Sequence, residues 1–170
     1  MRKTLHITLL FFMMLLTGAA NAETVTFDFT GESAYGMTLL SGSTQDYNPD
    51  PTVCTEGSVT LTLNGRSRWW KASKGNELRC YAGTTFTLSV PNGVVTKVEL
   101  TATTPSNFTA NGYSNGVWEG SASSVDFACT ITKSNTPISK IVVTYSASSA
   151  TKKAAELAFS ETSVTGVVGK

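Results

Sequence analysis

The sequence predicts an all-β fold, an antiparallel β-sandwich or jelly roll of about 8–10 short strands. Apolar and polar residues alternate with period two in many short runs, and these runs are rich in Val, Thr, Phe and Leu. Turn-forming pairs such as Asn-Gly separate the runs. Because no long segment keeps a helical period, we expect two sheets that each bury one face in a common core.

The expected strands follow the chain in order. The alternation is clearest in residues 24–29, 58–63, 85–90, 95–102, 124–131 and 138–145. The shorter runs 36–40 and 116–120 are also expected to form strands. Turns are expected at Asn64-Gly65, Pro91-Asn92-Gly93, Asn111-Gly112 and Asn115-Gly116, since glycine and asparagine tolerate the backbone angles of tight turns.

Residues 1–22 have the pattern of a secretory signal peptide. Arg2 and Lys3 precede an apolar stretch centred on residues 9–16, and the small residues Ala20 and Ala22 fit cleavage after Ala22. The apolar stretch is short for a bilayer span, and no later segment is apolar enough for one. We therefore expect export, to the cell surface or the medium or into the periplasm, with an N-terminal membrane anchor as the alternative.

Cleavage would leave a chain with a small net charge and without histidine. Of the 13 basic residues, 11 remain once Arg2 and Lys3 are removed, beside 12 acidic ones, so the net charge is about −1. This balance predicts no nucleic-acid partner. The only histidine, His6, leaves with the signal, which excludes histidine-activated serine or cysteine nucleophiles and removes the usual zinc ligand.

Three cysteines remain in the exported chain, and their spacings match no metal or redox motif. A disulfide between Cys80 and Cys129 is one alternative in an exported protein. Free, buried thiols at Cys54, Cys80 and Cys129, acting as small apolar residues, are the interpretation we favour.

The segment 58–71 is expected to form a β-hairpin. A two-residue turn at Asn64-Gly65 would put Arg66 and Arg68 on the apolar face, where burying them without partners costs several kcal/mol. A three-residue turn that includes Leu63, closed by glycine in a bulge, keeps both arginines outside and costs about 1–2 kcal/mol for the exposed leucine. We therefore expect the second register.

In this register two adjacent tryptophans face opposite sides. Trp69 faces the core, and Trp70 lies on the outer face beside Arg66 and Arg68; the face of Trp118 is not determined. An exposed indole can stack on a sugar ring while arginines hold hydroxyls or carboxylates, so Trp70, Arg66 and Arg68 are the candidate ligand-binding residues. The alternatives are that another segment covers Trp70, or that Arg68 simply stacks on it as a cation–π pair.

Other chemistry has less support in the sequence. The carboxylates are scattered, no glycine-rich phosphate loop is present, and a chain of this length leaves little room for a deep cleft, so we expect no catalytic residues and no enzyme activity. Residues 46–51, DYNPDP, could supply oxygen ligands to a structural calcium ion, with a plain rigid loop as the alternative. No other cofactor or metal is expected, and we expect a monomer.

The composition changes after the last long run. Residues 23–146 form the expected sandwich module, and residues 147–155, rich in Ser, Thr, Lys and Ala, have the composition of a linker. Residues 156–170 contain Leu157, Phe159 and the sequence SVTGVVGK. This pattern resembles the opening of bacterial Ig-like domains, which implies that an incomplete Ig-like domain begins there.

A larger resemblance covers most of residues 24–146. The stretches VTFDFT, GSVTLTLNGRSRWWKAS, NELRCYAGTTFTLSVPNGVVTKVELT and ISKIVVTY are similar to an N-terminal β-sandwich module of secreted proteins from Bacteroides and Prevotella relatives, in which Ig-like repeats follow. The resemblance implies export and a surface-presented or accessory role, without catalytic residues. We expect a module that binds a polysaccharide, a host glycan or another surface component; a passive spacer ahead of Ig-like repeats and an accessory domain of a larger secreted enzyme are the alternatives.

Overall fold

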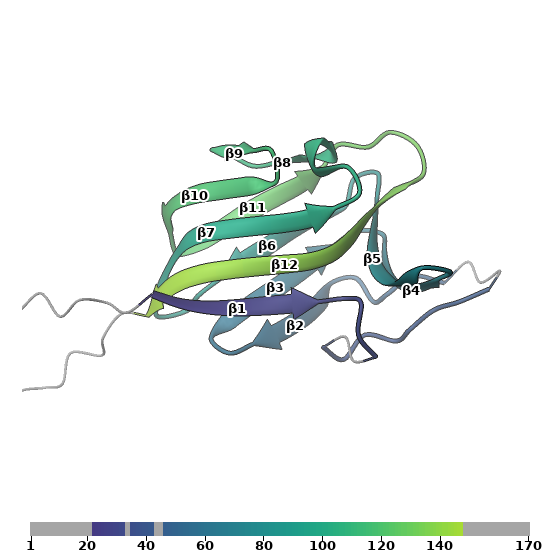
Figure 1. Cartoon of the computed structure of the whole chain (residues 1–170), viewed down its shortest axis with the longest axis horizontal. Coiled ribbons are helices and arrows are strands. Elements are labelled where there is room, and N and C mark those ends of the chain that lie inside the picture. Colours follow the sequence, from purple (N-terminus) through teal and green to yellow (C-terminus); the bar gives the residue numbers. More distant parts are fainter. Residues whose placement is uncertain (1–21, 33–34, 43–45, 148–170) are drawn as a thin grey trace, which may run out of the picture.

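The computed structural model describes residues 22–32, 35–42 and 46–147, and these residues form the predicted all-β fold (Figure 1). Residues 1–21 of the expected signal peptide, residues 148–155 of the expected linker and the Ig-like segment 156–170 lie outside the described residues. The elements are β1 (Ala22–Asp28), β2 (Thr52–Glu56), β3 (Val59–Asn64), β4 (Ser67–Ala72), β5 (Gly75–Tyr81), β6 (Thr85–Ser89), β7 (Gly93–Ala102), the 3-10 helix η1 (Pro105–Asn107), β8 (Phe108–Thr109), β9 (Tyr113–Ser114), β10 (Val117–Ala122), β11 (Ser124–Cys129) and β12 (Asn135–Ala147).

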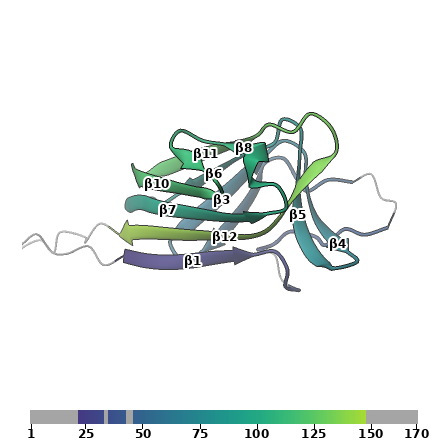
Figure 2. The same cartoon turned by 45° about the horizontal axis from the view of Figure 1, so that its top comes forward.

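The strands form two antiparallel sheets that pack face to face (Figure 2). The larger sheet has the order β4-β5-β12-β7-β10-β9, with β1 also paired to β12. The smaller sheet has the order β2-β3-β6-β11-β8. This arrangement is a β-sandwich, as the alternating pattern predicted.

The alternation of the sequence places one face of each strand in the core. In β3 the apolar residues Val59, Leu61 and Leu63 are buried, whereas the threonines between them are partly exposed. Phe86 of β6 and Phe127 of β11 stack at 4.8 Å between ring centroids in the same core. Burial of each such side chain contributes about 1.5–3 kcal/mol, which makes the shared core the main source of stability.

The long strand β12 organises the larger sheet. One of its edges pairs with β7 along most of its length. Its other edge pairs first with β5, through residues 135–138, and then with β1, through residues 140–146. The pairing register with β7 shifts between Ile138 and Lys140, so Ser139 lies in a β-bulge where the partner changes. We call this place, where β1 and β5 diverge, the fork.

The predicted hairpin between residues 58 and 71 is wrong. β3 pairs with β2 and β6 in the smaller sheet, so neither of its edges is left for β4, which pairs with β5 in the larger sheet. Asn64-Gly65 is therefore a crossover between sheets, and the Gly65 N–H donates to Asp50 Oδ1 at 3.0 Å. Leu63 is buried at 1% exposure as the last inward residue of β3, not in a turn.

The expected strand at residues 36–40 does not form. Leu40 makes only an isolated parallel bridge to Trp70. Tyr35 instead covers the free edge of β1, because its hydroxyl accepts a hydrogen bond from the Asp28 N–H at 2.7 Å and donates one to the Thr26 carbonyl at 3.1 Å. These bonds satisfy backbone groups that would otherwise form an open sheet edge.

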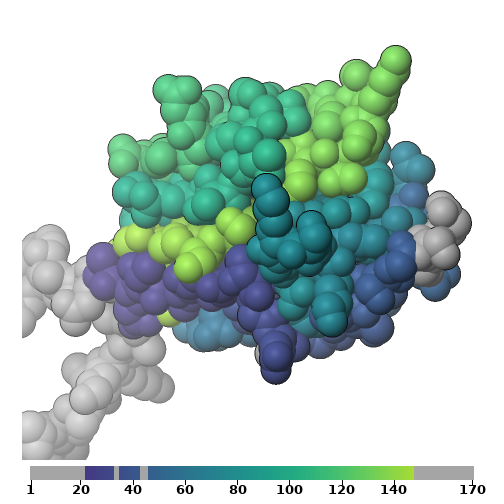
Figure 3. Space-filling model, turned by 45° about the vertical axis from the view of Figure 1, so that its right-hand side comes forward, coloured from purple at the N-terminus to yellow at the C-terminus, as the bar shows by residue number. Residues whose placement is uncertain are grey.

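The described chain enters and leaves the sandwich at one end. Ala22 of β1 pairs with Ser146 near the end of β12, whereas the β4–β5 hairpin lies at the opposite end (Figure 1). In Figure 3 this hairpin, coloured dark teal, is at the surface beside β1 (purple) and β12 (yellow-green). Across residues 22–32, 35–42 and 46–147 no helix is long and apolar enough to cross a membrane.

Candidate ligand-binding site

The β4–β5 hairpin sends its side chains alternately into the core and onto the outer face of the larger sheet. Trp69 opposes Leu78 on the inner face, and both are buried. The Trp69 indole Nε1 donates to the Phe29 carbonyl at 2.9 Å, so the polar atom of this buried ring is satisfied. Trp69 is inside, as the hairpin register predicted, although the hairpin itself was wrong.

Trp70 is half-buried on the outer face, opposite Glu77. Two guanidinium groups lie over its ring: Arg79 Cζ is 4.8 Å from the ring centroid and Arg68 Cζ is 5.6 Å from it. Arg79 Nε also forms an ion pair with Glu77 Oε1 at 2.7 Å. Two cationic groups therefore restrain the Trp70 ring, and part of its surface stays in solvent.

Arg68 is buried, and this corrects the expectation that it is exposed beside Trp70. Its exposed fraction is 8%, and its Cζ lies 4.3 Å from the Tyr47 ring centroid and 5.4 Å from that of Tyr81. Tyr47 reaches this position because the Asn48 N–H donates to the Ser67 carbonyl at 2.9 Å, which fixes the preceding loop along β4. The Nε of Arg68 has no hydrogen-bond partner. A planar cation enclosed by aromatic rings results.

Arg66, two residues before Arg68 in the chain, is exposed. Its Cζ lies 5.7 Å from the Tyr47 ring centroid, and the Tyr47 ring meets Tyr81 edge-on at 5.3 Å. The structure thus brings together the three candidate residues with three others. We call the set the arginine–aromatic face: Tyr47, Arg66, Arg68, Trp70, Arg79 and Tyr81.

Sequence reasoning did not include Tyr47, Arg79 and Tyr81 in the site. The alternation of ELRCY could have identified Arg79 and Tyr81, because a strand paired with β4 puts these alternate residues on the same face as Arg68. Tyr47 comes from an irregular loop, and no periodic pattern in the sequence predicts its position.

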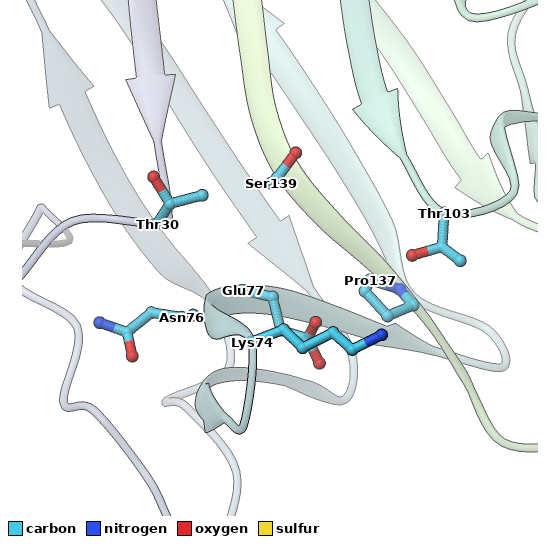
Figure 4. Close-up of a pocket in the computed structure, with 8 residues that line it drawn as sticks. Thr30, Lys74, Asn76, Glu77, Thr103, Pro137 and Ser139 are labelled. Carbon is cyan, nitrogen blue, oxygen red and sulfur yellow. The ribbon is translucent and has the colours of Figure 1, made fainter.

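A small polar hollow at the fork adjoins this face (Figure 4). It has a volume of about 140 Å³. Glu77, the cross-strand neighbour of Trp70, lines it and so connects it to the face. Lys74 and Glu77 reach it from the hairpin and Thr103 from the end of β7, whereas Asn76 points away and donates its amide to the Gly31 carbonyl at 2.6 Å. We call it the fork hollow; its lining is Thr30, Lys74, Gly75, Asn76, Glu77, Thr103, Pro137 and Ser139.

The fork hollow offers hydrogen-bonding groups of both kinds. The hydroxyls of Thr30, Thr103 and Ser139 can donate or accept, Lys74 donates and Glu77 accepts. Ser139 Oγ already donates to the Thr101 carbonyl at 3.1 Å, which fixes the bulge residue in place. Such a mixture suits a ligand rich in hydroxyl groups next to an aromatic surface.

The cysteines have the properties expected of packing residues. All three are free and buried. Burial raises the pKa of the Cys54 thiol to about 11, and burial together with the nearby Cys129 raises the pKa of the Cys80 thiol well above its usual range. Their thiolate forms are therefore scarce at neutral pH, which makes them poor nucleophiles and poor metal ligands.

The proposed calcium segment is used in part for loop structure. Asp50, which the sequence offered as an oxygen ligand, accepts the hydrogen bond from Gly65 at the crossover. Among the described residues no group of three or more His, Cys, Asp or Glu side chains is arranged to hold a metal ion.

Trp118, whose face the sequence left open, is buried at 6% exposure and donates Nε1–H to the Asn111 carbonyl at 2.7 Å.

Fold and surface together define a β-sandwich with a cationic, aromatic outer face next to a polar hollow. Comparison of the chain with protein families, with curated proteins and with solved structures found no match. Function is therefore inferred from the residues of this chain.

Proposed function

We propose that this domain is an exported, non-catalytic module that binds a glycan, on a cell surface or as free polysaccharide, through the arginine–aromatic face. One observation carries the proposal: a partly exposed tryptophan ring lies next to a polar hollow. Trp70 is half-buried on the outer face, and its cross-strand neighbour Glu77 lines the fork hollow. Sugar rings present apolar C–H faces to an indole and hydroxyls to polar groups at their edges.

The rigidity of the face supports this proposal. The guanidinium groups of Arg68 and Arg79, which are cross-strand partners, both lie over the Trp70 ring, and Arg79 is fixed by its ion pair with Glu77. A ring whose rotamer is already restrained loses little conformational entropy when a ligand stacks on it. A site built on paired strands is also held more firmly than one on a loop.

The position of the face leaves it accessible to a ligand. Both ends of the described chain lie at one end of the sandwich, and the hairpin lies at the other (Figure 1). The arginine–aromatic face therefore lies away from both ends of the described chain, and a ligand can reach it there.

The test measures binding of the purified chain without its signal peptide, residues 23–170, to a panel of immobilised plant, microbial and host polysaccharides. We expect binding to at least one of them, and Trp70→Ala should weaken it about thirtyfold or more, the effect of losing a central aromatic contact. Trp70→Phe should keep part of the affinity. Val53→Ala, which shortens an exposed apolar side chain on β2 of the other sheet, is the matched control and should bind as the wild type does.

Circular dichroism of each variant separates loss of binding from loss of fold. No binding by the wild type to any polysaccharide would contradict the proposal and favour the spacer alternative. Equal binding by wild type and a folded Trp70→Ala variant would place the ligand elsewhere on the domain.

A further inference from the structure

We infer that the glycan bound by the arginine–aromatic face is anionic, with a carboxylate or sulfate group on the saccharide; this rests on the proposed function. The face has an excess of positive charge. Arg66, Arg68 and Arg79 contribute three guanidinium groups, and Glu77 contributes one carboxylate, which is paired with Arg79. Even if Asp46, next to Tyr47 in the chain, is counted, basic groups exceed acidic ones by three to two.

The buried guanidinium of Arg68 strengthens this argument. Arginine stays charged at any physiological pH, and at 8% exposure water screens this charge poorly. The rings of Tyr47, Trp70 and Tyr81 offset part of the desolvation with their negative faces. The Nε–H still has no acceptor. The surface above Arg68 therefore has a positive potential that an oxyanion lowers and a neutral sugar does not.

The exposed Arg66 and the partly exposed Arg79 are the groups that a ligand can reach. They flank Arg68 and Trp70 on the same face. A guanidinium forms two parallel hydrogen bonds to a carboxylate or sulfate, and such charge-assisted bonds are about twice as strong as neutral ones. A ring stacked on Trp70 would thus have its charged substituent within reach of an arginine, and the fork hollow would take hydroxyls of the ring beyond.

The test compares polysaccharides that differ only in charge. Polygalacturonate and its fully methyl-esterified form share one backbone, and the ester lacks the carboxylate charge. Chondroitin sulfate and unsulfated chondroitin distinguish sulfate from carboxylate. In titration calorimetry of the chain without its signal peptide, residues 23–170, we expect at least one charged form to bind about tenfold or more tightly than its less charged counterpart. Its affinity should fall as salt is raised.

Charge-matched variants identify the groups responsible. Arg66→Gln should weaken binding of the charged form about tenfold, the effect of one charge-assisted hydrogen bond, and should leave the less charged form unaffected. Lys97→Gln removes the same charge from β7, on the same sheet but away from the hairpin, and should change neither. Arg66 is exposed, so its loss should leave the fold intact, which circular dichroism can verify.

The outcomes distinguish this inference from the proposed function. If the methyl-esterified form binds as tightly as polygalacturonate, and Trp70→Ala abolishes both, the face binds neutral glycans and the inference is wrong while the proposed function stands. If Lys97→Gln reduces binding as much as Arg66→Gln, the effect is one of net charge and the inference is also wrong. Binding to none of the polysaccharides would overturn both.

Discussion

The adjacent residues Trp69 and Trp70 should differ sharply in their contribution to stability. Trp69→Ala removes a side chain that is 3% exposed in the core, and such truncations cost about 3–5 kcal/mol. It also leaves the Phe29 carbonyl without its donor, which adds about 1 kcal/mol. The sum, about 4–6 kcal/mol, is a large part of the 5–15 kcal/mol that holds a typical domain of this size together.

Trp70→Ala should cost far less. Trp70 is half-buried on the outer face, and it contributes two cation–π contacts of about 0.5–1 kcal/mol each. The loss of partial burial adds about 1 kcal/mol, so we expect a total of about 2–3 kcal/mol. A protein without Trp70 should therefore stay folded, which is the condition for using this variant in binding assays.

Urea unfolding followed by far-ultraviolet circular dichroism measures both costs, because this signal does not depend on the tryptophan that is removed. Trp69→Phe, which refills most of the space but cannot donate to the Phe29 carbonyl, should lie between wild type and Trp69→Ala. If the two alanine variants lose the same stability to within about 1 kcal/mol, the assignment of opposite faces is refuted.

Three further experiments test the packing. Gly120→Ala should destabilise by about 1–3 kcal/mol in urea, since an added Cβ would lie 2.7 Å from the Trp118 ring; an unchanged midpoint would show that the ring can move. Tyr35→Phe should cost about 1–2 kcal/mol, because two backbone groups at the edge of β1 lose their partner, and hydrogen exchange should speed up in β1 and not in β11. At pH 8 a thiol reagent should label none of the three cysteines in the native protein and all of them in urea, since burial raises their pKa values; rapid native labelling would contradict this.

The period-two pattern predicted which residues face the core, and this part of the fold followed from the sequence. Leu61 and Trp69 are buried because each lies at an inward position of an alternating run, whichever strand is its neighbour. The same pattern contains no information on which strand is the neighbour. β3 and β4 are consecutive and have turn residues between them, yet they belong to different sheets.

The error at the crossover has a definite physical cause. The predicted hairpin register keeps Arg66 and Arg68 out of the core and exposes Leu63. In the structure Leu63 does not have to be exposed to keep the arginines out of the core. β3 pairs with β2 and β6 and buries Leu63, and the chain then changes sheets at Gly65. The desolvation cost of the arginines can discriminate between two registers of a hairpin. It cannot show whether the hairpin forms at all.

The candidate site was predictable in its strand residues and not in its loop residue. Arg68 and Trp70 share a face because they are two positions apart in β4. Whether that face is open depends on Tyr47, which lies more than 20 positions earlier in the chain and covers Arg68 but leaves part of Trp70 exposed. Tertiary contacts of this kind decide exposure, and no local pattern records them.

The burial of Arg68 would let one set of residues serve both stability and the proposed binding. Enclosed by three rings, its guanidinium fixes Tyr47 against β4 and holds Trp70 from one side. The same enclosure keeps a positive charge just beneath the surface, where low polarisability makes it act strongly on a nearby anion. A lysine could not replace it, because a compact ammonium neither stacks flat between rings nor stays reliably charged when buried. The rigidity of the face and its positive charge therefore have one structural cause.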